Sequence, residues 1–368
     1  MRVASPLVDR LRALIQTPGS GILDARLLAL ARSHRLHLVL EDRLRLPELK
    51  AERRAAAALE AVREVELRRV LTALAAAGIR AVLLKGAAIG RTHYRSPELR
   101  PRTDTDLLVP ADRRDEVAGV LEALGYGRAR ETDGELIVAQ FHYDIVDRAG
   151  VEHALDVHWR ISNVIAFAAV LTYDEIACEA GPLPGLGDGA CGPSAVHSLL
   201  LACTHRVAHH YDSADLLWLY DIHLLVERLS SAEEDQVVAL ASARGIRAVC
   251  AYSLSDAADA FKGRARALTA RLTPPPGLVE PTAAFLGDRV RPVDVLAADL
   301  RALDRWPARL HLLREHLLPG REYMFARYGT RRSSLLPWLY VRRIVAGAPK
   351  WFRSLAASDV AGPDETDG

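Results

Sequence analysis

Helical periodicity dominates the first 77 residues of the chain. Leu and Ala recur at spacings of three and four from residue 5 onward, with Arg and Glu between them, which predicts amphipathic helices. Residues 51–77 are the longest such stretch, and Gly78 suits its end because glycine adopts the left-handed cap conformation easily. We therefore expect an N-terminal helical segment, residues 1–77, that serves as a scaffold.

Short apolar runs and alternating patterns replace the helical periodicity between residues 78 and 160. Strands, helices and hairpins in this order are typical of a small mixed sheet with helices packed on it, so we predict the fold class α+β. The elements expected in chain order are strand 80–84, helix 87–95, strand 104–109, helix 110–124 and strands 126–130, 135–146 and 151–159.

Glycine and proline mark the boundary after this core. Residues 181–189 read GPLPGLGDG, a loop signal, and we expect a linker over residues 161–192. Ser194 is a plausible N-cap for the first of several helices that form a C-terminal helical domain, residues 193–355. We expect the acidic tail, residues 356–368, to be disordered.

Composition narrows the possible partners and compartment. The 368 residues carry 48 Lys and Arg against 47 Asp and Glu, so the net charge of +1 does not favour nucleic acid or an anionic membrane as the partner of the whole molecule. The four cysteines form no C-x-x-C pair, which argues against structural zinc and favours a reducing compartment. No apolar run reaches the length of a transmembrane segment, and we expect a cytoplasmic protein.

Three carboxylates in two predicted strands are the first candidate site. Alternation places Asp104 and Asp106 on one face of their strand, and Asp156 lies alone among apolar neighbours in the strand 151–159. If the two strands are neighbours, three carboxylates converge, and hard oxygen ligands of this kind suit Mg²⁺. Asp156 could instead be a buried, hydrogen-bonded aspartate, with Glu152 as the replacement third carboxylate.

Basic residues and a glycine flank these acids. Gly86 follows the strand 80–84, and the free amides of the helix after it could bind a phosphate. Lys85 could contact that phosphate or pair with an acid below the turn. Arg100 and Arg102 could neutralise a leaving pyrophosphate or could be solvated loop charges. His158 shares the face of Asp156 and either lines the pocket or packs in the core.

This set of motifs resembles the DNA polymerase beta-like nucleotidyltransferase superfamily, and more narrowly the uncharacterised nucleotidyltransferase family found in bacterial biosynthetic clusters. Weaker similarity extends to the helices near His205 and residues 218–221. The segments that carry the resemblance are Leu84-Lys85-Gly86, Arg100-Pro101, Asp104-Thr105-Asp106-Leu107-Leu108-Val109 and Asp156-Val157-His158-Trp159.

The resemblance implies an enzyme that transfers a nucleoside monophosphate from an NTP, such as ATP, to a hydroxyl of an acceptor and releases pyrophosphate. It implies two Mg²⁺ ions held by Asp104, Asp106 and Asp156. The acceptor would be a small molecule or peptide. Two alternatives stay open: a toxin-like transferase that acts on tRNA or protein, and a catalytically silent nucleotide-binding scaffold.

Two further features lie in the C-terminal half. His205 and His209 are spaced i, i+4 on a predicted helix, where a polar contact, for example with Asp221, is favoured over a zinc site. Aromatic and basic residues alternate over residues 335–353. That segment could contact an acceptor, a membrane surface or RNA, but the favoured interpretation is a helix packed on its aromatic side with solvated arginines.

Overall fold

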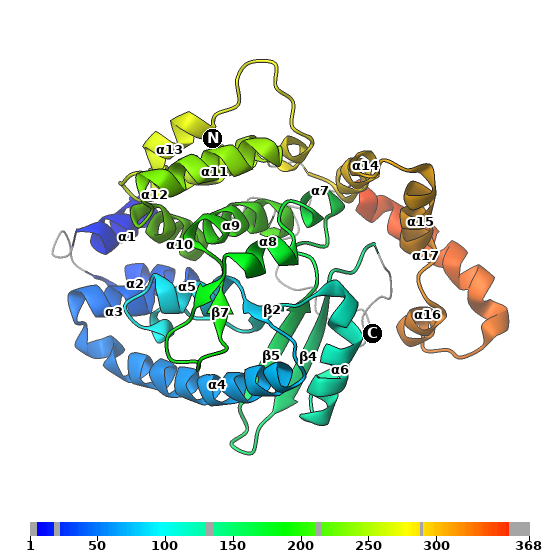
Figure 1. Cartoon of the computed structure of the whole chain (residues 1–368), viewed down its shortest axis with the longest axis horizontal. Coiled ribbons are helices and arrows are strands. Elements are labelled where there is room, and N and C mark those ends of the chain that lie inside the picture. The colour runs from blue at the N-terminus through cyan, green and yellow to red at the C-terminus, as the bar shows by residue number, and fades with distance from the viewer. Residues whose placement is uncertain (1–5, 18–22, 130–135, 211–214, 288–289, 353–368) are drawn as a thin grey trace.

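A mixed β-sheet lies between layers of helices and confirms the α+β fold class (Figure 1). The computed structural model describes residues 6–17, 23–129, 136–210, 215–287 and 290–352. The expected tail, residues 356–368, and residues 130–135, where one predicted strand ends and the next begins, lie outside these ranges. Within them, no helix is long and apolar enough to cross a membrane.

The N-terminal segment is helical, as its periodicity predicts. Its longest helix matches the stretch expected over residues 51–77 to within one residue at each end. Leu67, Val70 and Leu74 of that helix are buried because they recur on one side of it. The helices are α1 (Pro6–Gln16), α2 (Ala25–Ser33), α3 (His37–Leu44) and α4 (Lys50–Ala76).

The central sheet has the strand order β3-β4-β5-β2-β1-β7-β6. Strands β2 and β5 are parallel neighbours, and β4 runs antiparallel to β5 on its other side. The strands are β1 (Val82–Leu83), β2 (Thr105–Leu108), β3 (Gly127–Arg128), β4 (Gln140–Val146), β5 (Glu152–His158), β6 (Gly181–Pro182) and β7 (Cys191–Gly192). The expected adjacency of the two acid-bearing strands is therefore present.

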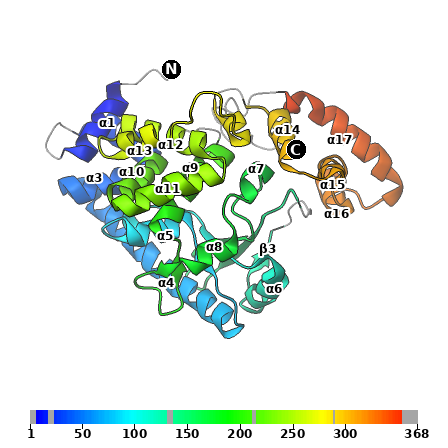
Figure 2. The same cartoon turned by 45° about the horizontal axis from the view of Figure 1, so that its top comes forward.

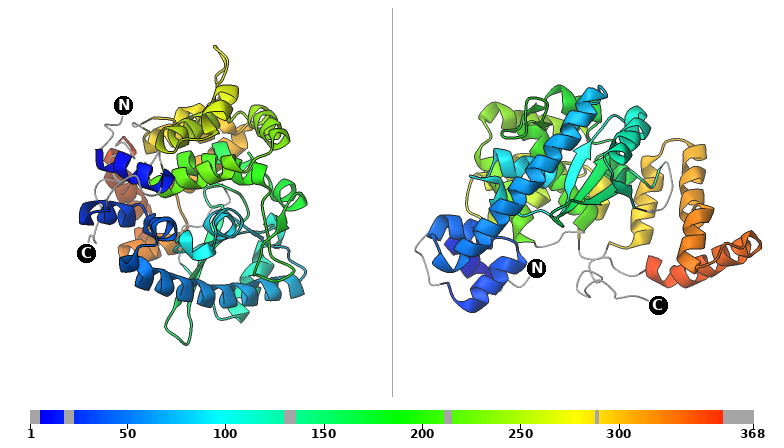
Figure 3. Two further views of the ribbon diagram at one scale, coloured as in Figure 1. Left: turned by 90° about the vertical axis from the view of Figure 1, so that its left-hand side faces the viewer. Right: turned by 90° about the horizontal axis from the view of Figure 1, so that it is seen from below.

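The two faces of the sheet have different partners. One face buries Leu107, Leu155 and Val157 against α4 and α6 (Arg114–Ala123), and α4 crosses the sheet in the view from below (Figure 3). The other face contributes Val82 and Leu108 to the core of the helical domain. Because strand side chains alternate, Asp106 and Asp156 share the face of Leu108 and lie toward the helical domain.

The helical domain covers that second face. Ser194 accepts a hydrogen bond from the amide of His197 at 3.3 Å and so caps the first long helix, as the sequence predicts. The segment expected as a linker, residues 161–192, contains two short helices and the strands β6 and β7. The helices from residue 161 to 272 are α7 (Ile165–Ala168), α8 (Tyr173–Cys178), α9 (Ala195–His210), α10 (Leu216–Glu227), α11 (Ser231–Ala243), α12 (Arg247–Ala260) and α13 (Ala265–Leu272).

The last described helices extend to one side of this body and form an arm (Figure 2). Leu312, Met324 and Leu339 of these helices are almost fully covered. The helices are α14 (Pro292–Ala302), α15 (Trp306–Leu317), α16 (Arg321–Tyr328) and α17 (Leu336–Trp351). Ala298 of α14 belongs to the core of the main body, so only residues 306–352, from α15 onward, are called the C-terminal arm below.

Candidate active site

Strand register brings Asp106 and Asp156 together. In the parallel pair β2 and β5, the Cα of Asp106 is directly opposite that of Asp156. Asp104 lies in the bend immediately before β2. The carbonyl oxygen of Asp106 also accepts a hydrogen bond from the amide of Leu84 at 3.0 Å, which places the end of β1 beside the acids.

Lys85 begins helix α5 (Lys85–Thr92) and points at Asp106. Its Nζ donates to Oδ1 of Asp106 at 2.6 Å. The φ angle of Lys85 is 48°, a left-handed conformation that residues other than glycine adopt rarely and at a cost. Strained backbone of this kind concentrates at functional sites, and here it directs a lysine and the start of a helix toward a carboxylate.

His158 lies on the same side of the sheet as the acids. Its Nε2 is 2.9 Å from Oδ1 of Asp106, and the side chain is almost fully buried. Its Nδ1 has no hydrogen-bond partner among the described residues. Ligand atoms of His158, Asp106 and Asp156 all lie within 4.8 Å of one another, so the structure places this histidine beside the acids.

Two residues that the sequence analysis did not single out hold Asp156. Nδ1 of His142 is 2.8 Å from Oδ1 of Asp156, and Nε2 of Gln140 donates to Oδ2 at 3.1 Å. Both come from β4, in which His142 is directly opposite Asp156. Alternation in the predicted strand 135–146 puts Gln140 and His142 on one face, but only the register shows which residue they meet.

The charges around this site do not balance. Burial by itself raises the pKa of Asp106, but Lys85 and the hydrogen bond from His158 outweigh it and hold that pKa well below its ordinary value. Burial raises the pKa of Asp104, and the negative charges of Asp106 and Asp156 raise it further. The cluster therefore carries more negative charge than Lys85 offsets.

The donor set fits a divalent cation. Two carboxylates and one imidazole converge, and a third carboxylate lies close enough to respond to their charges. Carboxylate oxygens suit Mg²⁺, and the imidazole nitrogen adds a ligand that Mn²⁺ and similar ions also accept.

Gly86 and Arg100 lie against each other beside the site. Gly86 is the second residue of α5, and a Cβ there would lie 2.8 Å from Nη1 of Arg100. Arg100 is buried and donates to Asp221 of α10 through Nε and Nη2, the latter at 2.7 Å. Tyr94 also donates to Asp221, at 2.7 Å. The glycine thus makes room for an arginine that joins the segment before β2 to the helical domain.

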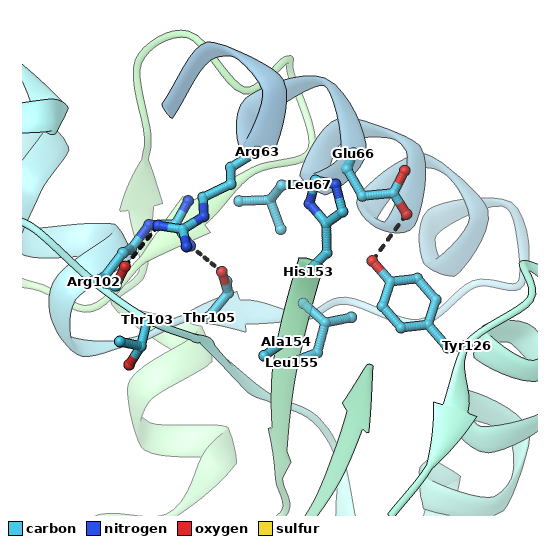
Figure 4. A pocket seen from close by; sticks show the side chains of 10 residues that line it. All are labelled: Arg63, Glu66, Leu67, Arg102, Thr103, Thr105, Tyr126, His153, Ala154 and Leu155. Atoms are coloured by element: carbon cyan, nitrogen blue, oxygen red, sulfur yellow. Dashed lines mark hydrogen bonds between the residues drawn. The ribbon is translucent and has the colours of Figure 1, made fainter. Parts of the chain in front are cut away.

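Arg102 lies on the opposite side of the sheet (Figure 4). It donates to the hydroxyl of Thr105, whose side chain points away from the Asp106 face, and it pairs with Glu60 of α4. Arg63 of α4 donates to the carbonyl oxygen of Arg102 at 2.6 Å. These contacts direct the guanidinium of Arg102 toward α4 and away from the carboxylates of Asp106 and Asp156.

A small pocket adjoins Lys85 on the side of the helical domain. Residues of α5, α9 and α10 line it, among them Ile89, His205 and Trp218. The rings of His205 and His209 are 5.0 Å apart, and Asp221 pairs with Arg100 and Tyr94. Asp221 thus forms an ion pair with Arg100, and the contact between His205 and Asp221 that the sequence suggested stays a prediction.

Comparison with known protein families identifies the family of this chain. No curated protein matches the chain. The sequence profile described as "Uncharacterised nucleotidyltransferase" matches residues 21–262, which include the sheet, the acid cluster and helices α9 to α12. The match covers well over half of the chain and confirms the resemblance, so this chain belongs to the uncharacterised nucleotidyltransferase family and is an enzyme of the nucleotidyltransferase class.

Proposed function

We propose that the enzyme uses Mg²⁺ to transfer a nucleoside monophosphate from an NTP to a hydroxyl group of an acceptor, with release of pyrophosphate. The observation that carries the proposal is the convergence of Asp106, Asp156 and His158 beside the start of α5, in a chain of a nucleotidyltransferase family. The four free cysteines suit the reducing environment of a cytoplasm.

Each acid has a distinct task in this proposal. Asp106 and Asp104 would hold the ions that carry the triphosphate, and Asp156 with His158 would complete the ligand set on the acceptor side. Divalent ions in such a site stabilise the negative charge of the attacking and leaving oxygens. His142 and Gln140 fix the orientation of the Asp156 carboxylate by their two hydrogen bonds.

The start of α5 is the proposed triphosphate contact. The first amides of a helix have no partner within the helix and attract anions. Lys85 adds a positive charge at the same point, within hydrogen-bond distance of Asp106. The pocket lined by Ile89, His205 and Trp218 adjoins Lys85 and offers a place for the nucleoside.

The chemical step balances as a substitution at phosphorus. The acceptor oxygen forms a bond to the α-phosphorus, and the bond between that phosphorus and the oxygen bridging to the β-phosphate breaks. Pyrophosphate leaves with the bonding electrons. The proton of the acceptor hydroxyl passes to Asp156, whose carboxylate lies on the acceptor side, and then to water.

Label transfer tests this proposal. The purified chain is incubated with each common NTP labelled at the α-phosphate, with Mg²⁺ and with fractionated extract of the source cells as the acceptor supply. We expect label to reach an acceptor, and Asp104→Asn with Asp106→Asn to lower the rate by about a thousandfold or more.

A matched variant and a binding measurement make the test decisive. Asp115→Asn removes a carboxylate that is 94% exposed on α6 and should leave transfer unchanged. Mn²⁺ titration followed by electron paramagnetic resonance reports ion binding without any acceptor. Transfer or Mn²⁺ binding that persists in the Asp104, Asp106 double variant would contradict the proposal.

A further inference from the structure

Exposed apolar side chains gather in the C-terminal arm. Ten of the fifteen large apolar residues that are exposed among the described residues belong to residues 306–352. Isolated apolar residues are common on protein surfaces, but a concentration of this size marks an interaction site. The ten are Trp306, Leu310, Leu317, Leu318, Leu335, Trp338, Val341, Ile344, Val345 and Phe352.

On α17 and its C-cap, four of these residues recur on one helix face. Trp338, Val341, Val345 and Phe352 are separated by three, four and seven residues, the spacing of a single helix face. They are between 58% and 67% exposed, whereas Leu339 on the other side is buried. The prediction that this helix packs on its aromatic side is therefore wrong for Trp338 and Phe352, which face outward.

On α15 the apolar residues show a second helical spacing. Trp306, Leu310 and Leu317 are separated by four and seven residues and are 68%, 60% and 38% exposed. Leu312 is the buried residue of this helix. Two helices of the arm thus expose apolar faces.

The arm is also strongly basic. Residues 306–352 contain nine Lys and Arg and two Asp and Glu, a net charge of +7 in a chain whose total is +1. Helix α17 contains no acidic residue, and the guanidinium of Arg342 lies 5.5 Å from the Trp338 ring. A basic helix with an exposed Trp and aliphatic stripe is typical of segments that lie in a membrane interface.

Direct contacts hold the arm on the body of the protein. Glu315 of α15 accepts hydrogen bonds from the amides of Leu136 and Ile137 at 3.0 and 3.1 Å. Within the arm, Arg343 donates to the carbonyl oxygen of His316 and Tyr340 to that of Pro319. The exposed stripe on α17 is therefore presented by a structured element that is fixed to the segment leading into β4.

We propose that the C-terminal arm docks the enzyme on an anionic phospholipid surface, with the α17 stripe in the interface and the exposed Lys and Arg side chains of the arm against the headgroups. Because the arm is basic, charge complementarity favours the phosphates of anionic lipids over a neutral bilayer. The exposed side chains are mostly aliphatic, which suits acyl chains better than RNA, where stacking aromatics and polar groups carry binding.

Vesicle cosedimentation of the full chain tests the proposal. We expect binding to vesicles of equal phosphatidylglycerol and phosphatidylcholine, weaker binding at high salt, and no binding to phosphatidylcholine alone. Trp338→Glu with Val345→Glu should lower the affinity by about tenfold or more. Arg332→Glu with Lys350→Glu should lower it as well and remove most of the salt dependence.

A matched pair of substitutions separates docking from general surface effects. Val65→Glu with Val279→Glu changes two valines that are 65% and 87% exposed outside the arm, and should leave vesicle binding unchanged. Circular dichroism confirms that each variant is folded.

Three results would overturn the proposal. The first is equal binding by the wild type and the Trp338, Val345 variant. The second is a dimer of the wild type that this variant loses, because the stripe would then pair with a second copy. The third is binding to RNA by a chain that ignores anionic vesicles.

Discussion

Two buried aspartates on either side of the α5 start, Asp106 and Asp221, have closely similar first partners. Each is about 5% exposed or less. Asp106 accepts hydrogen bonds from a lysine and a histidine, and Asp221 accepts them from an arginine and a tyrosine. By burial and hydrogen bonding alone, the two would be judged equivalent.

The charges beyond these first partners differ between the two aspartates. Asp221 faces Arg100, whose pKa is raised by that carboxylate despite the opposing effect of burial, and one charge matches the other. Asp106 faces Lys85 but also lies beside Asp156 and Asp104, and burial together with these two charges raises the pKa of Asp104. One cluster is balanced, and the other has surplus negative charge.

The difference indicates what each cluster is for. A balanced, buried pair that bridges the sheet and α10 holds two parts of the protein together, although such pairs are costly to desolvate. Surplus carboxylates destabilise the folded state and persist where a cation or a reaction needs them. Charge imbalance therefore distinguishes the candidate active site from a structural ion pair of the same appearance.

The largest expected effect on stability comes from breaking the balanced cluster. Asp221→Ala should destabilise the fold by about 3–5 kcal/mol because Arg100 is left buried without its partner. Asp104→Asn should leave stability unchanged or raise it by roughly 1 kcal/mol, since it removes a carboxylate from a repulsive group. Urea unfolding followed by circular dichroism measures both.

The reverse order of stabilities would contradict the structural role assigned to the Asp221 pair. A destabilised Asp104→Asn protein would mean that the acid cluster holds the fold together. As a control, Arg100→Met with Asp221→Leu removes both charges and should recover much of the stability that Asp221→Ala loses.

A smaller effect is expected from filling the space beside Arg100. Gly86→Ala places a Cβ 2.8 Å from Nη1 of a guanidinium that Asp221 and the carbonyl oxygen of Pro101 hold in place. We expect destabilisation of about 1–2 kcal/mol, because overpacking outweighs the gain in helix propensity.

Gly119→Ala is the matched control for this substitution. It lies in α6, where an added Cβ meets nothing within 4 Å, and it should stabilise the protein by about 0.5–1 kcal/mol. Thermal unfolding compares the two variants. Equal stabilities of the two alanine variants would show that Arg100 can move away and is not fixed by its pair.

The last expected effect is on ligand binding and concerns Lys85, whose positive charge partly offsets the surplus negative charge of the acid cluster. Lys85→Met removes the ammonium 2.6 Å from Asp106, so a divalent ion no longer competes with it. We expect Mn²⁺ alone to bind roughly tenfold more tightly. Binding of an NTP analogue with a non-hydrolysable α,β linkage should weaken in the same variant, because a phosphate contact is lost.

Isothermal titration with Mn²⁺ and with the analogue measures the two affinities of Lys85→Met. Lys85→Arg keeps the charge and is the control. Unchanged Mn²⁺ affinity in Lys85→Met would mean that Lys85 does not compete for the cation position. The charge imbalance would then not distinguish the Asp106 cluster from the Asp221 pair.

Local sequence pattern determined much of the fold and part of the site. The helical stretch that became α4, the strands carrying Asp106 and Asp156, and the shared face of Asp156 and His158 all follow from periodicities of 3.6 and 2, which neighbouring residues define. The family resemblance rested on the same short motifs. These features needed no knowledge of which segments meet.

The tertiary structure alone decided which charges became partners. Arg100 and Arg102 are two residues apart, yet one pairs with Asp221 of α10 and the other with Glu60 of α4 on the opposite side of the sheet. His142 and Gln140 reached Asp156 through strand register. Pairing between distant segments depends on the packing of the whole chain, so residue type and local spacing could nominate these side chains but could not assign their partners.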